Sequence, residues 1–319
     1  MKSPNFFIVG TAKAGTSSIG DYLNRHPEIY ISPIKEPHFF SEDIRMADFR
    51  SDYRERASFD VKAYLENHPL PYKHIAHIDN QSQYLELFRE VKNEKAIGEL
   101  STGYLYSNCA AENLFKFNPD AKIVMVLRQP VERAYSHYLM NIRDLWDYDS
   151  SFINALERDF ASSEKGWGKS HLYVELGLYF EQVGRYLKRF PESQVKIFLY
   201  EDLKNDPVKF IKKLCEFLEV GTYSLSPKDI AEHKNVAVLP RLKIQRAYLP
   251  IFNGFRKYIG MFLPDKVKDQ IRKMIFSSKN VPKLREDEFM QAMKYFSEDI
   301  QKLSVLIKRD LQSWHQMSK

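Results

Sequence analysis

The chain has 319 residues, of which 44% are hydrophobic and 28% charged. These values are close to those of ordinary globular proteins, and they exclude a disordered tail, a collagen-like chain and a low-complexity scaffold. Lys and Arg outnumber Asp and Glu by 48 to 42, a net charge of +6. This modest excess favours anionic partners such as nucleotides and anionic glycans, but it is far below the charge density of a dedicated nucleic-acid binder.

The two cysteines, Cys109 and Cys215, form neither a zinc pattern nor a disulfide framework. The amino end lacks the regions of a signal peptide, and no stretch is long and apolar enough to span a bilayer. The sequence therefore predicts a reduced, cytoplasmic protein with no transmembrane segment. A peripheral contact with a membrane stays open, and nothing indicates the oligomeric state.

Apolar runs alternate with helical patterns along most of the chain. Strands are predicted at residues 5–10, 29–32, 95–101, 122–127 and 195–200, and helices at 17–25, 82–91, 109–117, 130–143, 178–190 and 207–218. Residues 42–80 are predicted to be irregular. The run at 122–127 is typical of a strand buried on both faces of a parallel sheet. This order predicts a three-layer α/β fold with a central parallel sheet and a helical carboxy-terminal part, forming one domain over residues 1–319.

Two later stretches carry helical stripes. Near the carboxyl end, apolar residues recur at steps of three or four: Phe289, Met293, Phe296, Ile300, Leu303 and Ile307. Residues 248–263 also place their apolar side chains on one helical face. Packing on the core is the favoured interpretation of this second stripe, and a lid over an acceptor pocket or a lipid-facing surface is the alternative.

The first strand runs into a small-residue loop, Gly10-Thr11-Ala12-Lys13-Ala14-Gly15-Thr16-Ser17. Its glycine spacing is that of a P-loop, whose backbone amides bind phosphate together with the following helix. A nucleoside triphosphate site requires Gly-Lys-Ser/Thr at the end of the loop, whereas here Lys13 stands inside it and Thr16 follows Gly15. The loop predicts a phosphate site without the γ-phosphate lysine; a glycine-containing turn with no ligand is the alternative.

The strand at 122–127 ends in Arg128, where a magnesium-nucleotide enzyme would carry Asp. Arg128 and Ser136, on the following helix, are spaced so that both could reach one phosphate. The guanidinium offers a planar fork of donors that suits phosphate oxygens. These features argue against a nucleotide kinase.

Together the two segments resemble the cofactor motifs of sulfotransferases that use 3′-phosphoadenosine 5′-phosphosulfate (PAPS). The product that remains at this site after the transfer is adenosine 3′,5′-bisphosphate (PAP). The run Leu-Arg-x-Pro-Val-Glu-Arg-Ala-Tyr-Ser-His-Tyr from Leu127 is most similar to heparan-sulfate-type and bacterial carbohydrate sulfotransferases. The segments at 35–40, 200–203 and 310–314 support the same resemblance. It covers most of the chain and implies a P-loop-like fold.

The resemblance also implies residue roles. Lys13 would contact the phosphosulfate and steady charge on the leaving oxygen, and Glu36 would be the catalytic base. Arg128 and Ser136 would bind the 3′-phosphate, while the 5′-phosphate would be held by Ala14, Gly15, Thr16, Ser17 and Ser18. Lys234 and Arg241 lie in a polar stretch where the family closes over the cofactor; a solvated charged loop is the alternative.

The acceptor is less well specified. The heparan enzymes carry Lys after the glutamate of a Gly-Glu-Lys-Ser segment, whereas this chain has Gly98-Glu99-Leu100-Ser101, which argues against a heparan acceptor. His38 and Glu99 are candidate acceptor contacts, or polar groups satisfied at the sheet edge, and either could replace Glu36 as the base. His68, His74 and His77 lack further ligands at suitable spacing, so no metal is predicted.

The predicted function is transfer of a sulfuryl group from PAPS to a hydroxyl, or less favourably an amine, of a saccharide-type acceptor. In-line transfer requires a base and a cation at the leaving phosphate, and no metal. A sulfotransferase for a lipid, polyketide or other small alcohol is the first alternative. A non-enzymatic basic module that binds anionic polymers is another, although the charges form no Lys/Arg stripe.

Overall fold

The five predicted strands form one parallel sheet in the computed structural model, which describes residues 2–144, 146–147, 149–222, 239–240, 276–277 and 281–318. Its order is β2-β5-β1-β6-β7. The strands are β1 (Phe6–Gly10), β2 (Ile29–Ile31), β5 (Ala96–Leu100), β6 (Lys122–Leu127) and β7 (Val195–Leu199). The predicted central parallel sheet is therefore confirmed.

The strand order reverses at β1, which pairs with β5 on one side and with β6 on the other. Phe7 stands opposite Glu99 in β5 and Ile123 in β6. In open parallel sheets, ligands bind at the carboxyl ends of the strands where the order reverses. The topology thus points to the ends of β1 and β6, where the chain continues into Thr11 and Arg128.

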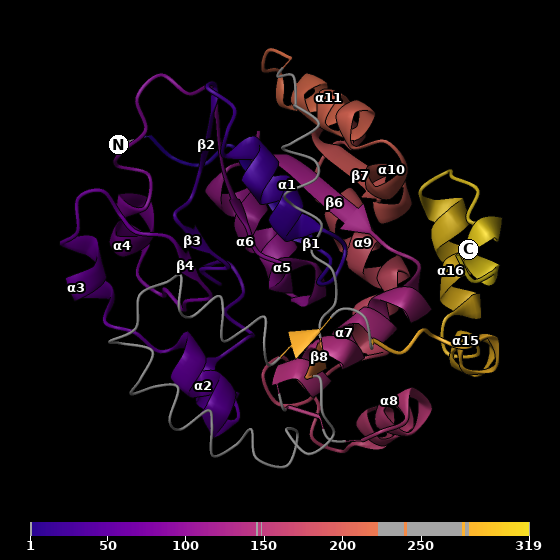
Figure 1. The fold of residues 1–319 in the computed structure, drawn as a ribbon. Helices are drawn as coiled ribbons and strands as arrows, with labels where there is room; N and C mark the ends of the chain where they lie inside the picture. The colour runs from indigo at the N-terminus through magenta and orange to yellow at the C-terminus, as the bar shows by residue number, and fades with distance from the viewer. Residues whose placement is uncertain are drawn as a thin grey trace.

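Alternating side chains divide the core between the two faces of the sheet. Phe6 and Ile8 face one cluster, which α1 (Thr16–Leu23) and α11 (Pro207–Leu218) cover. Phe7 and Val9 face the larger cluster on the other side. That cluster is covered by α4 (Gln81–Glu86), α5 (Gly103–Tyr106), α6 (Ala110–Phe117), α7 (Pro130–Asp144), α8 (Phe152–Ala161), α9 (Tyr179–Leu187), α15 (Glu286–Met293) and α16 (Ser297–Leu306). Figure 1 shows the sheet with helices on both faces, the three layers predicted from the sequence.

The segment predicted to be irregular contains short ordered elements. They are the 3-10 turn Met46–Asp48, α2 (Ser51–Ala57), α3 (Val61–Leu65) and the parallel pair β3 (Ile34–Lys35) and β4 (Lys73–His74). Helix α8 has no counterpart in the prediction, and α4 ends at Glu86 rather than near residue 91. The elements between residues 42 and 80 are short, so their periodicity is weak and tertiary contacts decide their conformation. Helix α8, by contrast, buries Phe152, Ala155 and Leu156 at helical spacing, a pattern that the prediction overlooked.

The carboxy-terminal stripe is divided between two helices. Helix α15 ends at Met293, and α16 begins at Ser297 after Phe296. Both helices direct their apolar residues into the same core cluster, so the predicted stripe is apolar throughout. The break between the two helices contains no Gly or Pro, and the sequence therefore gives no sign of it. Lys234, Arg241 and the stripe at 248–263 lie outside the described residues. Two further short strands, β8 (Leu239–Pro240) and β9 (Phe276–Ser277), pair in antiparallel fashion.

Candidate active site

The loop after β1 curls around the amino end of α1. The Thr11 amide donates to the Val126 carbonyl at 2.8 Å, which ties the loop to β6. The Ala14 amide donates to the Thr11 carbonyl at 3.3 Å, and the Ala14 methyl is fully buried in the cluster under α1. The phosphate loop predicted from the sequence is therefore held in place by both the sheet and the helix.

Gly15 permits this tight curl. It precedes α1 with φ 81°, and a Cβ at this position would lie 2.9 Å from Leu203 Cδ2 and 3.1 Å from Tyr200 Cε2. The N-cap residue, Gly15, makes no side-chain hydrogen bond to the start of α1, and the first turn contains no acidic residue. The amides at the start of α1 and the positive end of its dipole are thus available to an anion.

Lys13 brings a buried positive charge to this loop. Its Nζ lies 3.4 Å from Met140 Sδ, a weak acceptor. Burial, followed by the charges of Arg143 and Arg128, lowers the pKa of Lys13 to about 8. A cation that is desolvated beside other cations is stabilised strongly by an anionic ligand.

Arg128 lies directly against the same loop. Its Nη1 donates to the Lys13 carbonyl at 3.0 Å, and its guanidinium stacks 4.6 Å from the centre of the Tyr200 ring. Glu132 Oε2 is 3.6 Å away, and Tyr179 donates to the Arg128 carbonyl at 2.9 Å. The buried Nε of Arg128 finds no hydrogen-bond partner among the described residues. The structure therefore brings together two segments that are far apart in the sequence.

Helix α7 carries the rest of the predicted second segment. Ser136 is half-buried in its second turn. Arg133, to which the sequence analysis gave no role, is fully buried and donates to the Tyr173 carbonyl. Burial lowers the pKa of Arg133 to about 10, and the charge of Arg128 acts in the same direction. Arg133 thus adds positive charge to this region from inside the core.

Lys35 links the phosphate loop to the predicted base. Its Nζ donates to Ser17 Oγ at 2.7 Å and lies 3.7 Å from Glu36 Oε1. Only 11% of the Lys35 side chain is exposed, so this ammonium is not a solvated surface charge. The sequence pattern alone indicates no role for Lys35; only its position next to Glu36 in the chain suggests one.

Glu36 occupies a constrained loop. Its φ is 62°, a left-handed value that differs from the extended conformation favoured for a residue before Pro37. Two hydrogen bonds hold it there, from the Glu36 amide to the Leu100 carbonyl at 2.8 Å and from the Ala76 amide to the Glu36 carbonyl at 3.1 Å. Left-handed backbone at a non-glycine residue is unfavourable, so surrounding contacts must maintain it.

The Glu36 carboxylate is buried but ionised. Burial acts to raise its pKa, but the side chains of His74 and Lys35 outweigh burial and lower it to about 2. His74 Nε2 lies 3.8 Å from Glu36 Oε1, where the β3–β4 pairing places it. Glu36 is therefore in the form that accepts a proton at neutral pH.

His38 lies near Glu36 and is almost fully buried. Its Nδ1 is 3.4 Å from Ser41 Oγ, and its Nε2 has no partner among the described residues. The rings of His77 and Trp167 lie 6.3 and 5.8 Å from the His38 ring. Burial lowers the pKa of His38 to about 4, so its imidazole is neutral at physiological pH and suited to hydrogen bonding.

Glu99 is placed differently from the other predicted site residues. It is fully buried on the face of β5 that also carries Ile97, and Ser101 donates to its Oε1 at 3.3 Å. Burial raises the pKa of Glu99 to about 7, although the hydroxyls of Tyr104 and Tyr84 oppose this. Tyr104 in turn accepts from the Phe40 amide at 3.3 Å. Glu99 is thus buried beneath the segment that carries Glu36 and Phe40, and its predicted contact with the acceptor stays a prediction.

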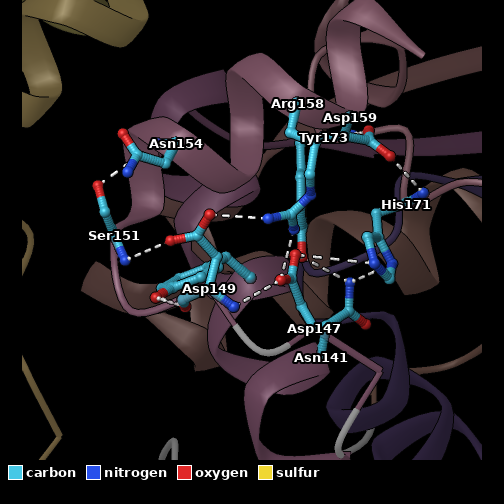
Figure 2. Close-up of polar contacts among 10 residues, drawn as sticks. Asn141, Asp147, Asp149, Ser151, Asn154, Arg158, Asp159, His171 and Tyr173 are labelled. Carbon is cyan, nitrogen blue, oxygen red and sulfur yellow. Dashed lines mark hydrogen bonds and ion pairs between the residues drawn. The ribbon is translucent and has the colours of Figure 1, made fainter.

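A polar network fixes the segment that carries Trp167. Asp147, whose side chain is buried, accepts from Arg158 at 2.7 Å and from Tyr173 at 3.0 Å (Figure 2). Asp159 accepts from the backbone amides of His171 at 2.7 Å and Tyr173 at 3.0 Å. These bonds anchor the chain on either side of α8, and the Trp167 ring is thereby held near His38.

Among the described residues, no three His, Cys, Asp or Glu side chains gather in a way that could hold a metal ion. His74 and His77, which the sequence places three apart, face Glu36 and His38 respectively. Lys234 and Arg241 lie outside the described residues, so their predicted part in the site stays a prediction.

Three proteins illustrate what this chain resembles. Carbohydrate sulfotransferase 15 of Mus musculus is 27% identical over 253 residues, covering 69% of this chain and 44% of the relative. Membrane-associated sulfotransferase kil1 of Dictyostelium discoideum is 22% identical over 310 residues, covering 72% of this chain and 59% of that protein. The crystal structure of a sulfotransferase from Alicyclobacillus acidocaldarius is 30% identical, with a TM-score of 0.68, and covers 99% of this chain and 100% of its own.

These relatives correct the predicted location. The expectation of a cytoplasmic protein is wrong, because the Dictyostelium relative is named membrane-associated. The chain also spans only about half the length of the curated relatives it matches. Among the described residues, no helix combines the length and the apolar character needed to cross a membrane.

The family model of the sulfotransferase domain matches residues 3–257, which is most of the chain. The bacterial crystal structure extends the agreement to the fold over nearly the whole length. The match also agrees with the predicted donor, PAPS. The chain therefore belongs to the sulfotransferase domain family, which confirms the enzyme class that its two phosphate-binding segments predict.

Proposed function

We propose that this protein transfers a sulfuryl group from PAPS to a hydroxyl of a carbohydrate acceptor, with Glu36 as the base. The observation that carries the proposal is the contact chain from the phosphate loop to a buried carboxylate: Ser17 to Lys35 at 2.7 Å, and Lys35 to Glu36 at 3.7 Å. A donor and an acceptor held at the two ends of this chain would meet beside Lys35.

The residues present fit PAPS. The N-cap residue of α1, Gly15, has no side chain, and Leu203 and Tyr200 lie too close for one. Arg128 Nε is buried without a partner among the described residues, as expected of a donor that awaits a phosphate oxygen. We assign Ala14, Gly15, Thr16, Ser17 and Ser18 to the 5′-phosphate by position. Arg128 and Ser136 are assigned to the 3′-phosphate.

When bound, PAPS supplies a sulfuryl group attached to a phosphate that can leave. Glu36 takes the proton of the acceptor hydroxyl on a carboxylate oxygen as that hydroxyl becomes the new sulfate ester. Lys13 and Lys35 stabilise the negative charge that remains on the phosphate side. The pKa of Glu36, lowered to about 2, keeps the carboxylate ionised, so it is ready to accept the proton as the acceptor oxygen becomes acidic during bond formation.

The acceptor class rests on the relatives. Carbohydrate sulfotransferase 15 is a carbohydrate sulfotransferase by name, and it matches 69% of this chain. The missing lysine after Glu99 distinguishes this chain from the heparan-type pattern. A saccharide outside the heparan class is therefore the acceptor that we favour.

Calorimetry with PAP tests the donor site directly. We expect PAP to bind in the presence of EDTA, because no described residue set supplies a metal site and the cations of the loop act alone. Radiolabelled transfer from PAPS to a panel of saccharides then tests the reaction. Binding of ATP with magnesium, together with failure of PAP to bind, would contradict the proposal.

A further inference from the structure

A cavity of about 490 Å³ lies beside the contact chain just described. Ser17 and Lys35 line it where it approaches the phosphate loop, and Tyr72 lines it elsewhere. Its volume falls within the range of about 300–1,000 Å³ that is usual for small-molecule sites. The cavity therefore has room for a short saccharide, but it is too small to enclose a long stretch of a polysaccharide.

Glu36 does not itself line the cavity, but Lys35 connects the two. Lys35 lines the cavity and lies 3.7 Å from Glu36 Oε1. Tyr72, which is 71% exposed, is close enough to both Asp21 and Glu36 for their charges to act on its hydroxyl. A ligand in the cavity that contacts Lys35 would thus be separated from the carboxylate by that one side chain.

The charges on the cavity wall are mixed and slightly acidic. Asp21, Glu90 and Glu94 line it together with the cations Arg25 and Lys35. Glu90 accepts from the Leu70 amide at 3.1 Å and Glu94 from the Lys92 amide at 2.6 Å, so both carboxylates have fixed positions. Because Lys35 is shared with Glu36, the carboxylates of the wall outnumber the cations that could receive sulfate groups on an acceptor.

Hydroxyl groups suit this wall better than anions do. Carboxylates and backbone groups accept hydrogen bonds from sugar hydroxyls, and the face of a tyrosine ring packs against the C–H surface of a sugar. The same carboxylates would repel a second sulfate or carboxylate on the ligand. The donor loop, with Lys13 and Arg128, has the opposite character.

We propose that this cavity is the acceptor subsite and that it takes an unsulfated, uncharged saccharide of a few sugar rings, discriminating against sulfated ones. The inference deepens the proposed function and rests on it. It names Tyr72 as a packing surface for the sugar, and Asp21, Glu90 and Glu94 as the groups that set specificity.

The first experiment compares N-acetyllactosamine with the same disaccharide carrying two sulfates, as acceptors for radiolabelled transfer from PAPS. We expect kcat/KM at least tenfold higher for the unsulfated form. Equal rates, or a preference for the sulfated form, would overturn the inference. So would the absence of transfer to either disaccharide by a protein that binds PAP and sulfates a simple phenol.

The second experiment substitutes residues that line the cavity. The double substitution Glu90→Lys and Glu94→Lys should reduce the preference for the unsulfated disaccharide severalfold. Tyr72→Ala should raise the acceptor KM at least fivefold, with PAP affinity unchanged. Glu192→Lys is a matched control, because Glu192 has a side chain that is 80% exposed and does not line the cavity. If the wall variants behave like this control, the cavity is not the acceptor subsite.

The two proposals fail in different ways. Loss of PAP binding and of all transfer activity in the unchanged protein would remove the proposed function. The cavity assignment alone would be wrong if the protein binds PAP and transfers sulfate, but substitutions of Tyr72, Glu90 and Glu94 leave its acceptor preference unchanged.

Discussion

The proposed donor side of the site and the side of the proposed base are built in different ways. The donor side is one continuous loop and helix start, residues 10–18, completed by Arg128 from the neighbouring strand. The side of the proposed base joins the loop of Glu36 and His38 to β4 and to the segment of Trp167. Local backbone geometry thus defines the proposed donor site, whereas the position of the proposed base depends on long-range contacts.

This difference has a physical cause. Phosphate is bound mainly by backbone amides and a few cations, which a short glycine-containing loop can supply by itself. An acceptor hydroxyl needs a base at one place and orientation, which requires side chains fixed by their neighbours. The comparison predicts that donor-side changes alter affinity and that acceptor-side changes alter rate.

The largest effect is expected at Glu36. Glu36→Gln keeps the shape of the side chain and removes its basicity, so turnover should fall roughly a hundredfold or more. PAP affinity should stay unchanged, because the substitution leaves the phosphate loop intact. Steady-state kinetics and calorimetry measure the two quantities, and circular dichroism controls for folding. Near-normal turnover would transfer the base role to another residue, with His38 as the next candidate.

The next effect is expected on the donor side. Arg128→Ala should weaken PAP binding by about 2–3 kcal/mol, since it removes a charge-assisted contact to phosphate. The chemical step at saturating PAPS should change far less. Arg189→Ala provides a comparison, because Arg189 pairs with Glu112 on the surface with 54% of its side chain exposed. An unchanged PAP affinity would exclude Arg128 from the donor site.

The lowered pKa of Lys13 predicts that PAP affinity depends on pH. Its pKa of about 8 in the free protein means that it loses its charge as the pH rises above 8. PAP affinity should therefore decrease above pH 8, by at most about tenfold per pH unit for one proton. Lys13→Arg should remove most of this decrease, because arginine stays protonated. Calorimetry at pH 7, 8 and 9 measures it, and a flat profile in the unchanged protein would refute the assignment.

The smallest effect concerns stability. The pKa of Glu99 is raised from 4.5 to about 7, so the native state keeps a proton that the unfolded chain loses between these values. Unfolding releases this proton, and stability should decrease as the pH rises from about 4.5 to 7. Relative to Glu99→Gln, the unchanged protein should lose at least about 1 kcal/mol over this window. Denaturant titrations at both ends test the slope, and parallel pH profiles would contradict it.

Several features follow from the sequence alone because they are local. The apolar runs at β1 and β6 predict buried parallel strands, and Gly15 with Lys13 predicts a phosphate loop that lacks the triphosphate lysine. Helix α11 begins at Pro207 and ends at Leu218 as predicted, because Pro207 stands at its first turn and Asp206 caps it. Such signals act within a few residues, so neighbouring side chains are sufficient to define them.

Other features depend on the tertiary structure. Pro37 favours an extended Glu36, yet hydrogen bonds with Leu100 and Ala76 hold it at φ 62°. Glu99 appears in the sequence as a polar residue near a strand end, but strand alternation turns it into the core. Lys35 becomes part of the site only because its ammonium reaches Ser17 on another element. Contacts between segments distant in the chain decide these positions, and no local pattern encodes them.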